Sequence, residues 1–164
     1  MFKRFYPNEY VPSVYGIDFQ KYYDQGIRGI VFDIDNTLVP HGFPADEQAI
    51  AFFEKLREIG FQTCLISNNK EARVKPFADK VGSMFEFKAN KPSRKNYVRA
   101  MERMNTDIHS TIFVGDQLFT DVWGANRSGM YSILTQPINP KEEIQIVLKR
   151  YLEKIVLHFY KPSK

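Results

Sequence analysis

The fold of this chain is decided by the stretch GIVFDIDNTLVPHG, residues 29–42. Its apolar run, Ile30-Val31-Phe32, is typical of a short buried strand, and it leads into two acidic residues, Asp33 and Asp35. A carboxylate is costly to bury unless a cation or hydrogen-bond donors offset its charge. Alone, a D-x-D-x-T pattern is also typical of a turn, because Asp and Asn bond their own backbone. The stretch therefore predicts a strand that ends either in a turn or in a site with its own positive charge.

Composition limits the classes of protein to which the chain can belong. The 164 residues are 43% hydrophobic and 26% charged, which is typical of a soluble globular protein. No apolar run approaches the about 20 residues that cross a bilayer, and the N-terminal MFKRFYPNEY lacks the apolar segment of a secretory signal. The single cysteine, Cys64, is expected to be a reduced core residue. We therefore expect a cytoplasmic protein.

Apolar runs alternate along the chain with segments that have helical spacing. Such alternation forms βαβ units, so it predicts an α/β fold with a mainly parallel sheet and right-handed crossovers. One domain is expected over 1–164, with a core at about 26–136 between an N-terminal flank, 1–25, and a C-terminal helical flank, 137–164. The predicted strands are 29–32, 61–66, 84–87, 111–114 and 130–134, and the predicted helices are 45–59, 70–81, 93–104, 119–128 and 140–158.

Polar side chains follow four of the predicted strands. Because ligands bind beyond the carboxyl ends of parallel strands, we expect these side chains to meet at one edge of the sheet. Each alone is also typical of a turn, a helix cap or a solvated surface. Together they supply the parts that metal-assisted phosphoryl transfer needs. They are Asp33, Asp35, Asn36 and Thr37, then Ser67, Asn68 and Asn69, then Lys91, and finally Asp116 and Asp121.

A hard divalent cation such as Mg²⁺ explains why these residue types occur together. It takes oxygen ligands, which the carboxylates of Asp33 and Asp116 and a backbone carbonyl near Asp35 can supply. The cation offsets the clustered negative charge and the repulsion between a carboxylate nucleophile and a phosphate dianion. The groups that can bind phosphoryl oxygens are Ser67, Lys91 and the backbone N–H groups near Asp35 and Asn68.

The four motifs together resemble those of the haloacid dehalogenase (HAD) superfamily. The resemblance covers roughly residues 29–134 and implies a HAD-type, Rossmann-like three-layer α/β/α sandwich. Its mainly parallel sheet would have five strands in the order 5-4-1-2-3, numbered along the chain. The matching motifs are DIDNTL at 33–38, LIS at 65–67, KP at 91–92, whose proline favours Lys91 over Lys88, and GDQLFTD at 115–121.

The resemblance also implies a role for each motif residue. Asp33 would be the nucleophile that forms an aspartyl-phosphate, and Asp35 would first protonate the leaving alcohol and then activate water. Ser67, Asn68 and Lys91 would bind the phosphoryl group. The implied metal is Mg²⁺, with Asp33, Asp35, Asp116 and Asp121 at its site and Thr37 supporting the loop.

The spacing of the motifs leaves no room for the cap domain that many HAD proteins carry. Residues 39–44 alone separate the first motif from the next helix, and 23 residues lie between Ser67 and Lys91. The chain therefore resembles the capless subclass IIIA. Within it, the opening segment 6–18 and the motif wording are similar to bacterial relatives of phosphatidylglycerophosphate phosphatases. An open site must accept a bulky substrate or borrow a lid from another subunit of a homo-oligomer.

Four functions are consistent with these features. The favoured one is a Mg²⁺-dependent phosphomonoesterase acting on a lipid phosphate, such as phosphatidylglycerophosphate, at the inner face of the membrane. The substrate could instead be a soluble phosphorylated metabolite or a phosphoprotein. The net charge of +4 also fits a non-catalytic phosphate- or nucleic-acid-binding module. We expect no specific nucleic-acid partner, because the sequence has no dense basic stripe and no aromatic stacking motif.

The two ends of the chain bear on peripheral membrane contact. The final helix is predicted to pack its apolar face on the sheet, and the aromatic residues of the N-terminal flank are predicted to pack likewise. The alternative is that this basic amphipathic helix lies on an anionic membrane surface. The apolar residues at helical spacing are Ile144, Val147, Leu148, Tyr151, Leu152, Ile155, Val156 and Phe159, and the basic ones nearby are Lys149, Arg150, Lys154 and Lys161.

Overall fold

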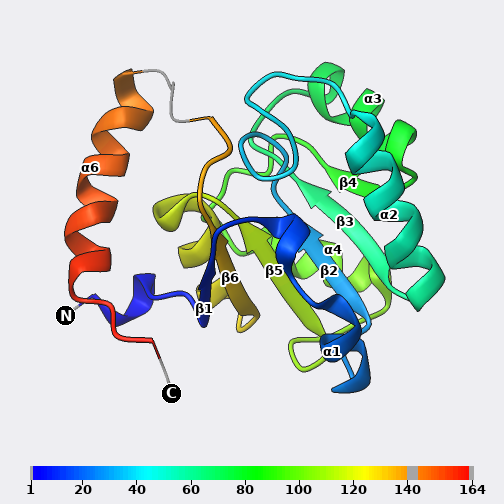
Figure 1. Cartoon of the computed structure of the whole chain (residues 1–164), viewed down its shortest axis with the longest axis horizontal. Coiled ribbons are helices and arrows are strands. Elements are labelled where there is room, and N and C mark those ends of the chain that lie inside the picture. Colours follow the sequence, from blue (N-terminus) through cyan, green and yellow to red (C-terminus); the bar gives the residue numbers. More distant parts are fainter. Residues whose placement is uncertain (1, 140–143, 163–164) are drawn as a thin grey trace.

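A parallel sheet of six strands forms the centre of the protein in the computed structural model, which describes residues 2–139 and 144–162 (Figure 1). The strand order is β1-β6-β5-β2-β3-β4. The five predicted strands keep their predicted order within it, and a sixth lies at the edge beside β6. The strands are β1 (Glu9–Val11), β2 (Gly29–Phe32), β3 (Gln62–Ile66), β4 (Met84–Glu86), β5 (Thr111–Gly115) and β6 (Tyr131–Thr135).

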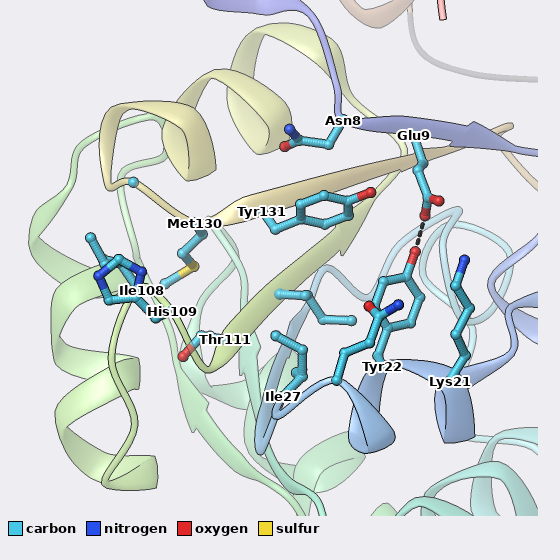
Figure 2. A pocket seen from close by; sticks show the side chains of 13 residues that line it. Asn8, Glu9, Lys21, Tyr22, Ile27, Ile108, His109, Thr111, Met130 and Tyr131 are labelled. Atoms are coloured by element: carbon cyan, nitrogen blue, oxygen red, sulfur yellow. Dashed lines mark hydrogen bonds between the residues drawn. The ribbon is translucent and has the colours of Figure 1, made fainter. Parts of the chain in front are cut away.

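The edge strand β1 corrects the prediction of five strands. Tyr10 pairs in parallel with Leu134 of β6, so a segment assigned to the N-terminal flank completes the sheet. With three residues between Asn8 and Pro12, β1 is too short for a period of two to show in the sequence. Side-chain contacts support its position, because Tyr22 donates a hydrogen bond to the carboxylate of Glu9 (Figure 2).

Helices cover both faces of the sheet and give three layers (Figure 1). One face packs against α1, α2 and α3 around Phe32 and Phe53. The other face packs against α4 and α5 around Tyr97 and Phe113. The predicted helix 119–128 is in fact a π-helical turn, Leu118–Val122, that continues into α5. The bounds are α1 (Phe19–Asp24), α2 (Glu47–Ile59), α3 (Glu71–Val81), α4 (Lys95–Met104) and α5 (Trp123–Arg127).

No cap domain interrupts the described part of the chain near the sheet edge. A loop without a further helix or sheet strand joins Leu38 to the start of α2 at Glu47, where Asp46 Oδ1 caps the helix by accepting from the Ala49 N–H at 2.8 Å. Only α3 and β4 lie between Ser67 and Lys91. The carboxyl edge of the sheet is therefore covered by short loops on this side, as the motif spacing predicts.

The last helix, α6 (Ile144–His158), stands beside the β1–β6 edge of the sheet (Figure 1). Its predicted start at Pro140 lies outside the described residues. The prediction that its apolar face packs on the sheet is wrong. Among the described side chains of this apolar set Val156 is buried, whereas the others form an exposed surface, here called the outer face of α6. These are Val147 (47% exposed), Leu148 (65%), Tyr151 (69%), Leu152 (55%), Ile155 (45%) and, just beyond the helix, Phe159 (56%).

The N-terminal aromatic residues pack as predicted, on a small cluster beside α6. The ring of Phe5 makes edge contacts with Phe119 and Trp123, and the Tyr6 ring meets Tyr160. Phe5 and Tyr6 pack with the buried Val156 of α6 in one apolar cluster. Within 2–139 and 144–162, no helix combines the length and apolar character needed to cross a membrane.

The contact between α5 and α4 gives a stability test. A Cβ added at Gly124 would lie 2.6 Å from Cε2 of Tyr97, a ring that is fully buried and cannot move aside. We expect Gly124→Ala to lower the free energy of unfolding by about 1–3 kcal/mol, measured by urea denaturation. Gly16→Ala is the matched control, because a Cβ there meets nothing within 4 Å. Equal stability of the two variants would contradict this packing.

Candidate active site

The central strands of the sheet bring the predicted site residues to one edge. Phe32 of β2 lies opposite Leu65 of β3 and Val114 of β5, so the residues that follow these three strands are neighbours. A small hollow of about 80 Å³ opens there. The predicted residues that line it are Asp33, Asp35, Asn36, Ser67, Asn68, Asn69 and Lys91.

Three buried carboxylates gather beneath this hollow. Oxygen atoms of Asp33, Asp116 and Asp121 all lie within 4.8 Å of one another. Lys91 Nζ bridges two of them, at 2.8 Å from Asp33 Oδ1 and 2.6 Å from Asp121 Oδ1. The Thr37 hydroxyl lies 3.3 Å from Asp33 Oδ2 and 3.0 Å from Asp116 Oδ1. Lysine and threonine thus tie the carboxylates into one network, here called the acid cluster.

The three carboxyls of the acid cluster do not ionise alike. Burial, together with the charge of Asp33, raises the pKa of Asp116 well above its usual range. Burial likewise raises the pKa of Asp121 to about 6. Burial also opposes ionisation of Asp33, but the charge of Lys91 and hydrogen bonds outweigh it and lower the pKa of Asp33. Asp33 is therefore the most readily ionised of the three carboxyls.

The acid cluster fits a divalent cation. Its donors are carboxylate oxygens, which suit hard ions such as Mg²⁺ rather than thiol-binding metals. Burial and the neighbouring charge of Asp33 raise the pKa values of Asp116 and Asp121, so additional positive charge would favour their ionised forms. A bound cation would supply that charge, and Asp33, Asp116 and Asp121 could hold it.

The structure places the Asp35 side chain on the other side of the hollow, away from the acid cluster. Asp35 Oδ1 accepts from the Gly42 N–H at 2.7 Å and from Arg73 Nη2 at 2.9 Å. Its Oδ2 accepts from Asn69 Nδ2 at 2.8 Å. These contacts hold the Asp35 carboxylate at the hollow that Asp33 also lines. Sequence reasoning missed Arg73, because an arginine at the start of α3 carries no signal of this contact.

The phosphate-binding candidates from β3 and the Lys91 loop also meet here. Ser67 is buried, and its Oγ accepts from the Asn69 N–H at 3.1 Å. The Asn68 side chain accepts from the Lys91 N–H at 2.7 Å, so Asn68 orients the lysine loop. Lys88 is exposed, whereas Lys91 is buried in the acid cluster. The structure therefore places Lys91 at this site, as the following proline indicated.

One residue of the site comes from outside the motifs. Arg150, on the inner side of α6, donates hydrogen bonds to the carboxylate and to the backbone oxygen of Asp116. It also lies 3.1 Å from Glu153, whose other oxygen accepts from the Leu118 N–H at 2.8 Å. Sequence reasoning treated Arg150 as part of a basic flanking helix, because nothing in the local pattern shows which side of α6 faces the sheet.

A second hollow lies at the opposite edge of the sheet. It has a volume of about 500 Å³ and is lined by the amino ends of strands and by α1 (Figure 2). Its described lining has a single carboxylate, that of Glu9, which already accepts from Tyr22. Within the described residues, the three clustered carboxylates therefore lie at the carboxyl edge of the sheet and not at this second hollow.

Comparison with known proteins agrees with this geometry. The sequence model described as "Hydrolase: haloacid dehalogenase-like hydrolase" matches residues 41–129. A Bacillus subtilis protein named "Probable phosphatase YqeG" is 36% identical over 159 residues, which cover 96% of this chain and 92% of that protein. This chain belongs to the haloacid dehalogenase-like hydrolase family. The predictions of a HAD superfamily member and of a hydrolase of phosphoric monoesters are thus confirmed.

Two further relatives of this HAD phosphatase are more distant. An Arabidopsis thaliana protein named "Phosphatidylglycerophosphate phosphatase 1, chloroplastic/mitochondrial" is 26% identical over 90% of this chain. The chain spans about half of that protein, 48% of its length. A structure described as a HAD superfamily (subfamily III A) hydrolase from Legionella pneumophila has a TM-score of 0.56 at 15% identity, over 73% of this chain and 70% of that one, which shows a shared fold.

The raised pKa of Asp121 predicts how stabilisation by a bound divalent cation would depend on pH. In the metal-free protein, this acid lowers stability as the pH rises from 3.8, its ordinary pKa, to about 6, because the folded state retains the proton longer. A cation competes with that proton. We therefore expect Mg²⁺ to raise the Tm more at about pH 7 than at about pH 5, on either side of that pKa. Asp121→Asn should flatten this dependence, and an equal Mg²⁺ effect at both pH values would contradict it.

Proposed function

We propose that this HAD phosphatase is a Mg²⁺-dependent phosphomonoesterase that forms an aspartyl-phosphate on Asp33 and acts on a lipid phosphate, such as phosphatidylglycerophosphate. The observation that carries the catalytic part is the ionised Asp33 carboxylate, bridged by Lys91 and facing the hollow at the sheet edge. The lipid part is supported by the outer face of α6 and by an apolar cavity beside it.

The first step of this proposal is a transfer of the phosphoryl group to Asp33. A carboxylate oxygen of Asp33 bonds to phosphorus as the ester oxygen leaves, and Asp35 gives its proton to the departing alcohol. Asp35 then takes a proton from a water molecule, whose oxygen attacks phosphorus and releases inorganic phosphate and the Asp33 carboxylate. The hydrogen bonds from Asn69 and Arg73 orient Asp35 for both transfers.

The remaining groups bind the phosphoryl group and its charge. Lys91, Ser67 and the backbone N–H groups near Asn68 line the hollow and would donate to the phosphoryl oxygens. A bound divalent cation would reduce the repulsion between Asp33 and the phosphate. Its proposed ligands are Asp33, Asp116 and Asp121, together with a backbone carbonyl at Asp35 and with Thr37 supporting the loop.

Replacing the proposed nucleophile tests the catalytic part. We expect Asp33→Asn to lower the turnover of an aryl phosphate in Mg²⁺ by at least about 10³-fold, because an amide cannot form the acyl phosphate. Asp79→Asn is the control, since Asp79 is an exposed residue of α3 paired with Lys75. Borohydride reduction of quenched wild-type enzyme should modify position 33, detected by peptide mass spectrometry. Substantial turnover by Asp33→Asn would rule out the covalent route.

The surface around α6 supports a lipid substrate. A cavity of about 320 Å³ between α6 and the β1–β6 edge reaches Asp116. Apolar side chains such as Leu134, Val147 and Leu157 line it, so it could receive the apolar part of a substrate near the acid cluster. The outer face of α6 continues this apolar surface toward solvent.

The charges around the outer face of α6 favour an anionic membrane. Lys149, Lys154 and Lys161 are exposed, whereas Glu153, the one acidic residue within the described range 144–162, is buried. A basic helix with an exposed apolar face lies naturally in the interface of an anionic bilayer. Contact there would bring the carboxyl edge of the sheet near phosphorylated lipid head groups.

A substrate panel tests the lipid part. The Leu148→Gln, Leu152→Gln double variant should lose about tenfold or more of its activity on phosphatidylglycerophosphate in anionic vesicles, because two side chains no longer enter the bilayer. Its activity on an aryl phosphate should remain unchanged. Val98→Gln, at an exposed apolar residue of α4, is the control. A preference of the wild type for sugar phosphates or phosphopeptides over the lipid would instead favour the alternatives, with a second subunit as the lid.

A further inference from the structure

We propose that Arg150 is an internal cation that occupies the metal site at Asp116 and is displaced when a divalent cation binds. Through this exchange α6 would regulate metal loading. The inference rests on the proposed function in one respect, that the acid cluster binds a metal. It adds a residue outside the four motifs, and it assigns to α6 a role inside the site.

The contacts of Arg150 show that its guanidinium is directed into the site. It donates to the Asp116 carboxylate and to the Asp116 backbone oxygen, so two of its N–H groups are committed to one residue. The Arg150 side chain is 13% exposed and the Asp116 side chain is fully buried. A charged hydrogen bond of this kind, shielded from water, is far stronger than a surface ion pair. Asp116 is therefore already engaged by a cation before any metal arrives.

Arg150 and a divalent cation compete for the same carboxylate. Arg150 donates to Oδ2 of Asp116, and Asp116 is one of the three acids that could hold the metal. A divalent cation bound there would lie close to the guanidinium, and like charges at short range in a buried site repel each other. Metal binding therefore weakens the contact between Arg150 and Asp116, and that contact in turn opposes metal binding.

A second carboxylate, that of Glu153, can still accept from Arg150 after the guanidinium releases Asp116. Glu153 lies three residues further along α6, with Oε2 at 3.1 Å from Arg150 Nη1. It is itself anchored, because Oε1 accepts from the Leu118 N–H of the π-helical turn. When Arg150 releases Asp116, the guanidinium remains paired with Glu153 and avoids the cost of an isolated buried charge. The exchange therefore needs a side-chain movement, and α6 keeps its packing through Val156.

Metal titration of matched variants tests the exchange without any substrate. Arg150→Met keeps the aliphatic stem and removes the charge, whereas Arg150→Lys keeps the charge. Calorimetric titration of chelator-treated protein with Mg²⁺ at neutral pH should give a Kd about tenfold lower for Arg150→Met than for the wild type. Arg150→Lys should remain close to the wild type. Lys149→Met, which removes an exposed charge from the same helix, should not change the Kd.

Each outcome decides the proposal. A Kd for Arg150→Met that is unchanged or higher would overturn it, because Arg150 would then support the site rather than compete for it. Equal tightening by Arg150→Met and Arg150→Lys would overturn competition by charge. Absence of Mg²⁺ binding in wild type and variants alike would overturn both this inference and the metal requirement of the proposed function. Binding with unaltered variant affinities would overturn only the inference.

A measurement on the wild type covers the case in which a variant does not fold. Phenylglyoxal modifies accessible arginine side chains, and peptide mass spectrometry reports the rate at Arg150. Mg²⁺ should increase that rate several-fold, because the guanidinium leaves the buried Asp116 carboxylate. Arg94, an exposed arginine directly before α4, serves as the internal control. A rate at Arg150 that Mg²⁺ leaves unchanged would overturn the exchange.

Discussion

Repulsion among three buried carboxylates is the constraint on which the rest of the structure depends. Asp33, Asp116 and Asp121 lie within 4.8 Å of one another, and such a group can be buried only where cations meet it. Lys91 reaches it from the loop after β4, and Arg150 reaches it from α6. Segments far apart in the sequence are thereby joined at one edge of the sheet. The sheet topology brings the three carboxylates together, and Lys91 and Arg150 offset their negative charge.

The resemblance to the HAD superfamily supplied the order of the five predicted strands, and one rule supplied the residues that follow β2, β3 and β5. Parallel strands end at a common edge, so side chains placed just after them converge whatever the details of the loops. Lys91 was found for a further reason, since a proline follows it. The placement of Asp33, Ser67 and Asp116 together is thus a consequence of topology, which alternating apolar runs reveal.

Other parts of the structure could not be predicted, because they depend on contacts between distant segments. The strand β1 is defined by its pairing with β6 and has little pattern of its own. Periodicity correctly showed that α6 has an apolar face, but a period does not say which way a face is turned. The helix presents its polar side to the acid cluster, where Arg150 meets Asp116. Because the apolar face of α6 was predicted to pack on the sheet, the contact of Arg150 with Asp116 was missed as well.

The outer face of α6 has a consequence for the behaviour of the folded protein in solution. The native state itself presents a contiguous apolar surface, so self-association through it needs no unfolding. Kosmotropic salts such as sulfate strengthen burial of such a surface, whereas the charges of Lys149, Lys154 and Lys161 oppose close approach at low ionic strength. The ionic composition of the medium should therefore control association of the folded protein through this face. Such association can change while the thermal stability of the fold does not.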